Sequence, residues 1–157
     1  MKIFGMQISN KLPQFHQHKS LLVVTGYYEA EYFIAYQGFI EKVQAFKLEK
    51  PEYSDREGFF EQKAQGVAFG SPAIQERIKR KMKQDFFKQC KEMQKKFNDD
   101  HDLVHIYIFT PEPLSIDLKK TFSKKLQQKI VFTFGGNYYK EHPFELLKRI
   151  QKESKSS

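Results

Sequence analysis

The sequence contains a single cysteine and no long apolar run. One cysteine, Cys90, excludes an internal disulfide framework and a zinc site built from cysteines. No apolar stretch approaches the roughly 18 to 20 residues that a membrane span requires, so we expect no membrane partner. The first residues lack an apolar segment followed by a small-residue cleavage site, which predicts no secretory signal and a cytoplasmic protein.

Aromatic residues and positive charge are what the chain has in abundance. Its 157 residues include 16 phenylalanines and 8 tyrosines, which favour a packed core over a disordered chain. Lys and Arg number 27 against 19 Asp and Glu, giving a net charge of +8. The length suits one domain with one core. We expect an N-terminal arm or edge element at residues 1–20, a single α/β domain at 21–152 and a frayed tail at 153–157.

The first half of the domain has the pattern of β-structure. Residues 21–25 form a short apolar run typical of a central strand. Residues 32–36 and 39–48 are rich in aromatic and β-branched side chains, and Gln37-Gly38 between them predicts a hairpin. Three antiparallel strands are therefore expected.

A long loop and a long helix follow. Residues 49–71 have no period and carry Pro51 and three glycines, and loops of about 23 residues tend to be functional or disordered. Ser71 and Pro72 are a helix start, with serine as the N-cap and proline at the first helical position. Apolar residues then recur at steps of three and four, which predicts a helix of about 26 residues: Ile74, Ile78, Met82, Phe86, Cys90, Met93 and Phe97.

The remaining elements alternate between strands and helices. Residues 103–109 and 130–134 read as strands, and Pro143 opens a last short helix. Between the two strands, one helix is expected from the spacing of Leu114, Leu118, Phe122 and Leu126. The order β-β-β-α-β-α-β-α, with right-handed crossovers, predicts a mixed α/β fold around a five-stranded mixed sheet.

Positive charge is concentrated on the long helix. Residues 72–97 hold nine basic and three acidic side chains, and a second lysine cluster lies on the following helix. Lysine, which makes point-charge contacts to phosphate, far outnumbers arginine, so the pattern favours the backbone of structured RNA over base reading in DNA. A solvated helix that binds nothing is the alternative. The predicted RNA-binding residues are Arg77, Lys79, Arg80, Lys81, Lys83, Lys88, Lys91, Lys119, Lys120, Lys124 and Lys125.

Other polar clusters give weaker signals. Residues 99–102 (Asp-Asp-His-Asp) stand where a helix must end, so we interpret them as turn formers and not as metal ligands. His16 and His18 have no third ligand nearby in the sequence, and Cys90 falls on the apolar stripe. Three acids near strands, Glu29, Glu31 and Glu41, show no sign of converging on a nuclease site. We therefore predict no catalytic residue, no metal and no small-molecule cofactor.

Two stretches carry a resemblance to a known family. Residues 65–71 (Gln-Gly-Val-Ala-Phe-Gly-Ser) lead into a basic helix at residues 77–87, and Lys129 precedes a strand that ends in Gly135-Gly136. This arrangement resembles the middle domain of the eukaryotic and archaeal peptide-chain release factors and of pelota. The likeness is closest to their bacterial stand-alone relatives, the host attachment proteins.

The resemblance implies a translational-machinery-component fold of the ribonuclease H-like type and a place on or near the ribosome. It does not imply peptide release, because the family's Gly-Gly-Gln motif is absent and the corresponding loop offers Ala64-Gln65-Gly66. We expect Gln62, Gln65 and Gly66 at a loop tip that touches the partner.

The sequence thus favours a non-enzymatic protein associated with the ribosome or with structured RNA. Two alternatives stay open. One is a hydrolase acting on an RNA or peptidyl-tRNA ester, and the other is a homodimeric protein-interaction module.

Overall fold

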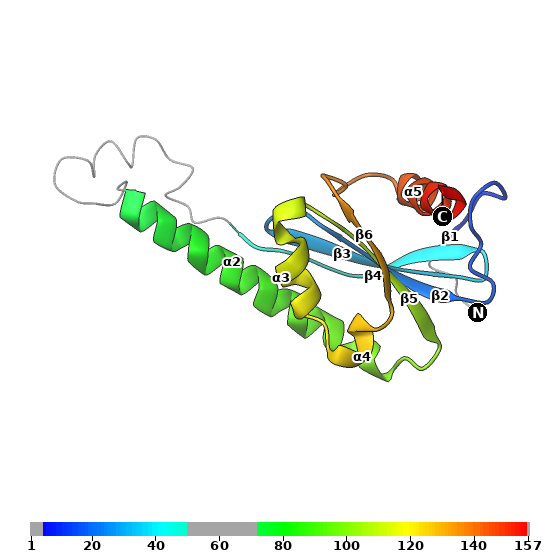
Figure 1. Cartoon of the computed structure of the whole chain (residues 1–157), viewed down its shortest axis with the longest axis horizontal. Coiled ribbons are helices and arrows are strands. Elements are labelled where there is room, and N and C mark those ends of the chain that lie inside the picture. The colour runs from blue at the N-terminus through cyan, green and yellow to red at the C-terminus, as the bar shows by residue number, and fades with distance from the viewer. Residues whose placement is uncertain (1–4, 50–71, 157) are drawn as a thin grey trace.

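The structure, a computed structural model, describes residues 5–49 and 72–156 of the chain. Its centre is one six-stranded sheet in the order β1-β4-β3-β2-β5-β6 (Figure 1). The strands are β1 (Met6–Gln7), β2 (Lys19–Thr25), β3 (Glu29–Tyr36), β4 (Phe39–Lys47), β5 (Leu103–Thr110) and β6 (Ile130–Gly135). The helices are α2 (Pro72–Gln94), η3 (Lys95–Asp99), η4 (Glu112–Leu114), α3 (Ser115–Lys120), α4 (Lys124–Gln127) and α5 (Pro143–Ser156).

The sheet is mixed, as the sequence predicts. Strands β1, β4, β3 and β2 pair antiparallel, whereas β2, β5 and β6 pair parallel. The prediction of five strands is wrong, because the N-terminal segment adds the edge strand β1, in which Met6 pairs with Ile40. A strand of two residues is too short to show a period of two in the sequence. The same segment also buries Ile8 and Leu12 in the core.

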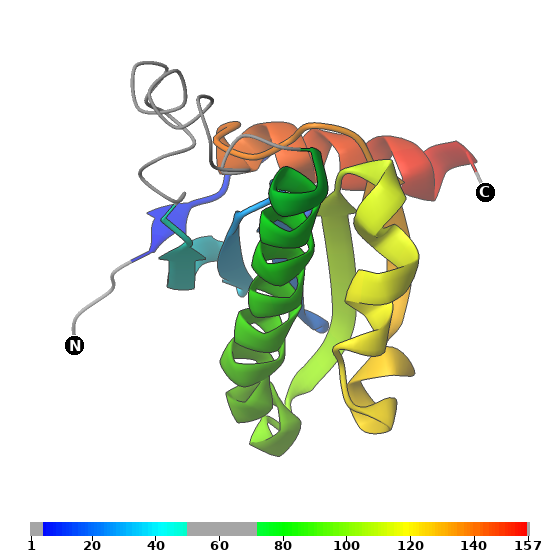
Figure 2. The same ribbon diagram turned by 90° about the vertical axis from the view of Figure 1, so that its left-hand side faces the viewer.

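Two layers of helices cover the sheet. Leu21 and Val23 of β2 point into the core beneath α2, α3 and α4, while Leu22 and Val24 point into the core beneath α5. Figure 2 shows α2 beside α3 in front of the sheet and α5 crossing behind it. Because β2 is covered on both faces, its apolar run is continuous and does not alternate.

Helix α2 packs on the sheet only along part of its length. Met82, Phe86 and Cys90 of the predicted stripe are buried, but Ile74 and Ile78 are half-buried. The reason is visible in Figure 1, where the first turns of α2 extend beyond the sheet. The predicted single helix of about 26 residues is also shorter, because the last turns form the 3-10 helix η3.

The predicted helix through Leu114, Leu118, Phe122 and Leu126 is not continuous. All four side chains are buried, but the helix breaks between α3 and α4. The Thr121 hydroxyl donates to the carbonyl oxygen of Leu118 (2.6 Å), and the Ser123 hydroxyl accepts the Leu126 N–H (3.2 Å) as the N-cap of α4. These side chains stabilise a helix end and a new start within one apolar stripe. At the C-terminus, α5 continues through residues 153–156, a segment expected to be frayed.

A buried polar network fixes α2 and α3 relative to the sheet. The Gln94 amide donates to the Tyr32 hydroxyl (3.1 Å), and the Thr121 hydroxyl shares its one proton between the Gln94 amide oxygen (2.9 Å) and the Leu118 carbonyl oxygen. Burial raises the pKa of the neighbouring Cys90 thiol to about 12 and also raises the pKa of Tyr32, so both groups are neutral. Buried polar groups that satisfy one another specify a unique packing of the elements that carry them.

Replacing Tyr32 with Phe should lower the free energy of unfolding by about 1 to 3 kcal/mol, because the buried Gln94 amide then loses its acceptor. Urea denaturation measures this free energy, and we expect the m-value to stay unchanged. The double variant Tyr32→Phe with Gln94→Met removes both polar partners, so it should cost less than the sum of the two single changes. Strictly additive costs would show that the two groups are not coupled.

Candidate nucleic-acid interface

Helix α2 presents its charged side chains to solvent. All seven predicted basic residues on it are exposed, namely Arg77, Lys79, Arg80, Lys81, Lys83, Lys88 and Lys91. Their exposure follows from the amphipathic pattern, because the residues that recur at steps of four from Met82 to Cys90 occupy the buried face. The charge is therefore held on a rigid helix and not on a loop.

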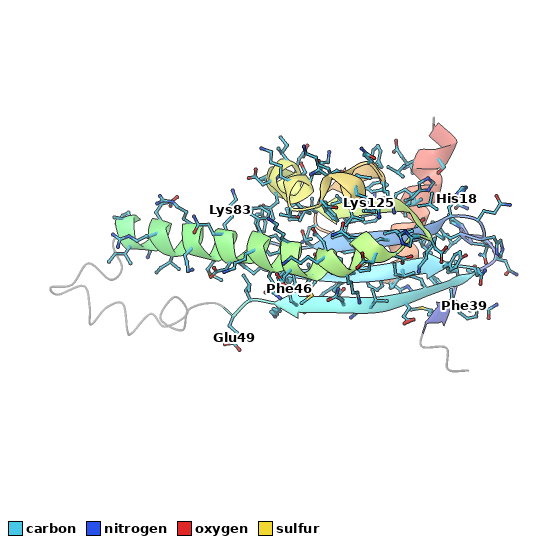
Figure 3. The ribbon with its side chains drawn as sticks, turned by 90° about the horizontal axis from the view of Figure 1, so that it is seen from below. His18, Phe39, Phe46, Glu49, Lys83 and Lys125 are labelled. Atoms are coloured by element: carbon cyan, nitrogen blue, oxygen red, sulfur yellow. The ribbon has the colours of Figure 1, made fainter. Side chains whose placement is uncertain are left out.

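The second lysine cluster lies next to the first. Lys119 and Lys120 end α3, Lys124 and Lys125 begin α4, and all four are exposed. Lys83 of α2 lies 4.0 Å from the Asp117 carboxylate of α3 (Nζ to Oδ2), and Lys125 of α4 donates to the carbonyl oxygen of Asn98 in η3 (2.9 Å). Figure 3 shows Lys83 and Lys125 on the same side of the sheet. We call the eleven exposed residues on these three helices together the basic surface.

Few of these cations are neutralised. Lys81 lies 3.2 Å from Asp85, and Lys83 is paired with Asp117. Both pairs are exposed, and exposed ion pairs contribute little and exchange readily for other anions. Arg77, Lys79, Arg80, Lys88 and Lys91 form no ion pair with another described residue. The surface therefore retains the positive potential that attracts a polyanion.

The predicted loop-tip residues Gln62, Gln65 and Gly66 lie outside the described residues, as does the proposed N-cap Ser71. Helix α2 begins at Pro72, the position expected from the sequence.

The acidic turn after η3 has a structural explanation. Asp100 pairs with Lys19 (2.7 Å) and accepts the backbone N–H of Asp102 (3.1 Å). Partial burial raises the pKa of Asp100, but the hydrogen bond and charge of Lys19 and two backbone N–H groups outweigh it, so its pKa is lowered. Among the described residues, no three His, Cys, Asp or Glu side chains are placed to hold a metal ion.

The three acids near strands, Glu29, Glu31 and Glu41, are not arranged as a catalytic pair of carboxylates. Glu31 and Glu41 line one groove of about 650 Å³, but Glu31 is bound to Lys42 (2.8 Å). Glu29 instead accepts the backbone N–H of Tyr28 (3.1 Å).

In the part of the chain that the structure covers, no helix is long and apolar enough to cross a bilayer.

One pairing of side chains has no signal in the sequence. The rings of His18 and His105 lie 5.0 Å apart at the beginning of the parallel strands β2 and β5. Burial, and then the charge of His18, lowers the pKa of His105. The two residues are far apart in the chain, and only the strand pairing brings them together.

The His105 environment predicts an acid-sensitive stability. Its pKa in the folded protein lies below the ordinary value of 6.5, so the unfolded chain takes up this proton first as the pH falls. The free energy of unfolding should therefore decrease as the pH drops below 6.5, and His105→Gln should weaken that decrease. Chemical denaturation of both proteins between pH 7.5 and about 5 measures it. Identical pH profiles would contradict the assignment.

Comparisons with known proteins bear on the fold. No protein-family model matches the sequence, and no curated protein matches it. The chain is similar to the solved archaeal translation termination factor aRF1, over 90% of its own length and 40% of that chain, with 9% sequence identity and a TM-score of 0.54. It is also similar to S. cerevisiae Dom34, a translation termination-like factor involved in RNA quality control pathways and interacting with Hbs1. There the overlap is 88% of this chain and 37% of that one, with 12% identity and a TM-score of 0.46.

The chain thus spans about two fifths of the length of aRF1. The similarity to aRF1 confirms that the mixed α/β fold is one found in a translation termination factor, as the resemblance of the sequence implied. At this level of identity the likeness establishes the fold alone.

Proposed function

We propose that this protein, on or near the ribosome, binds the phosphate backbone of structured RNA. The observation that carries the proposal is the basic surface, whose eleven cations on α2, α3 and α4 are all exposed. A surface rich in lysine and poor in arginine suits phosphate contacts that do not read sequence. The fold shared with a translation termination factor supports the ribosome as the place where such RNA is met.

The proposal is for a non-enzymatic role. The sequence has no Gly-Gly-Gln motif, and two of the acids considered for catalysis are engaged in separate contacts: Glu31 with Lys42, and Glu29 with a backbone N–H. We also propose a relation to the bacterial stand-alone members of this group, which the sequence resembles at residues 65–71, 77–87 and 129–136. The hydrolase and the homodimeric module remain the rival functions.

Charge reversal on α2 tests the proposal. The triple variant Lys79→Glu, Arg80→Glu and Lys83→Glu should abolish co-sedimentation with ribosomal particles in lysate of the host. In fluorescence anisotropy with a purified RNA hairpin, the slope of log affinity against log salt should fall by about 1 for each phosphate that the variant no longer neutralises. A phosphate without its protein cation keeps its counterions, which is why the slope reports the number of phosphates bound.

The matched control carries the same change in charge elsewhere. Lys11, Lys140 and Lys148 are exposed and lie outside the basic surface, so their replacement by Glu should leave most of the binding intact. Equal losses of affinity in both triple variants would show that net charge and not this surface binds RNA. Cleavage of the hairpin or of peptidyl-tRNA by the wild-type protein would favour the hydrolase, and a dimer that is stable in high salt would favour the interaction module.

A further inference from the structure

The face of the sheet that carries α5 is covered unevenly. Along β5, Phe109 is fully buried, whereas His105 and Tyr107 on the same face are half-buried. Along β6, Phe134 is 8% exposed and Phe132 is 37% exposed. The cover provided by α5 therefore ends partway along these strands, and the rings near their beginnings reach the surface.

These accessible rings form one cluster. Tyr107 and Phe132 are partners in the register of the parallel strands β5 and β6. The His105 ring lies 6.2 Å from that of Tyr107 in an edge-to-face arrangement, and His18 lies against His105. Four rings from three neighbouring segments thus share one patch, which we call the ring platform: His18, His105, Tyr107 and Phe132.

Buried rings on the same face of the sheet lie beside the platform. The Phe132 ring contacts that of Phe134 (4.6 Å), and Phe134 is stacked on Phe109 (4.5 Å, 6° between the planes). Phe109 in turn contacts Tyr138, whose ring is covered by the Arg149 guanidinium of α5 (5.3 Å). Side chains that are fixed by buried neighbours lose little conformational entropy when a ligand binds.

The surroundings of the platform favour an anionic ligand with flat rings. An acidic turn precedes β5 at this end of the sheet, and its Asp100 is paired with Lys19 (2.7 Å). Arg149 lies at one side, and Lys129 immediately precedes β6. A second copy of the chain, with a net charge of +8, would be repelled. Nucleic-acid bases stack on accessible aromatic rings of a sheet regardless of sequence.

We infer that the ring platform stacks unpaired bases of an RNA whose structured part is held by the basic surface. This inference rests on the proposed function and adds a ligand class to it, single-stranded RNA on the opposite face of the sheet. In the chain, Lys129 stands between α4, which carries Lys124 and Lys125 of the basic surface, and the start of β6.

The test compares two RNAs on the full chain. One is the hairpin alone, and the other is the same hairpin with a single-stranded extension of roughly eight nucleotides, a length within the usual site sizes for single strands. The extension should raise wild-type affinity about five- to hundredfold, as expected for one stacked base. A 2-aminopurine in the extension should lose fluorescence on binding, which reports stacking directly.

The variant Tyr107→Leu with Phe132→Leu keeps apolar bulk but removes two rings. It should lose the gain in affinity from the extension and the 2-aminopurine quenching while binding the hairpin as the wild type does. Tyr27, which is 50% exposed in the turn after β2 and thus at the other end of that strand from His18, gives the matched control. Tyr27→Leu should leave both RNAs bound with wild-type affinity.

The outcomes separate the two proposals. A hairpin that binds, with an extension that adds nothing, overturns the ring platform and leaves the proposed function in place. Failure of the wild type to bind either RNA overturns both. If the double variant weakens both RNAs equally and unfolds at lower urea, the rings are structural and the platform is wrong. If it changes only self-association in sedimentation equilibrium, the face docks a second copy and the inference fails.

Discussion

Burial of strand β2 on both faces is the constraint on which the rest of the structure depends. Its apolar residues alternate between the core beneath α2 and the core beneath α5, so each face of the sheet must be covered by a helix. The strand also joins the two halves of the sheet, since it pairs antiparallel with β3 and parallel with β5. At its end, the buried hydroxyls of Thr25 and Thr110 lie 2.6 Å apart and link β2 to β5. The position of the basic surface follows, because α2 can bury its apolar stripe only by turning its cations outward.

The sequence predicts the elements whose signal is local and long. The apolar run of β2 and the stripe of α2 are both visible in it, and with them the exposed cations of the basic surface. The features without a sequence signal depend on partners distant in the chain or on single side chains. Strand β1 forms by pairing with β4, in which Met6 is the partner of the distant residue Ile40. The break between α3 and α4 follows from side-chain hydrogen bonds of Thr121 and Ser123. The ring platform has no local signal at all, because strand pairing assembles it.

The two candidate surfaces differ in what they ask of the fold. The flexible side chain of lysine can reach a phosphate from more than one position. The first turns of α2 can therefore carry phosphate-binding lysines although they extend beyond the sheet (Figure 3). Stacking requires rings at fixed spacing, and the platform stands on paired strands with the buried rings of Phe109 and Phe134 beside it. The buried network of Tyr32, Gln94 and Thr121 fixes α2 against α3 and so sets the relative positions of the cations that the two helices carry.

An accessible apolar strand at the edge of a sheet would ordinarily invite pairing with another chain. Two features of β6 oppose this. Consecutive residues of β5, Ile106 and Tyr107, pair with Ile130 and Phe132 of β6, so Val131 is an extra residue in β6. This bulge makes the edge irregular. Bulges of this kind blunt an edge for strand addition. The net charge of +8 keeps copies apart as well. Both features disfavour a second protein strand and leave the ring faces accessible to a polyanion. This combination suits a platform for RNA bases better than a dimer interface.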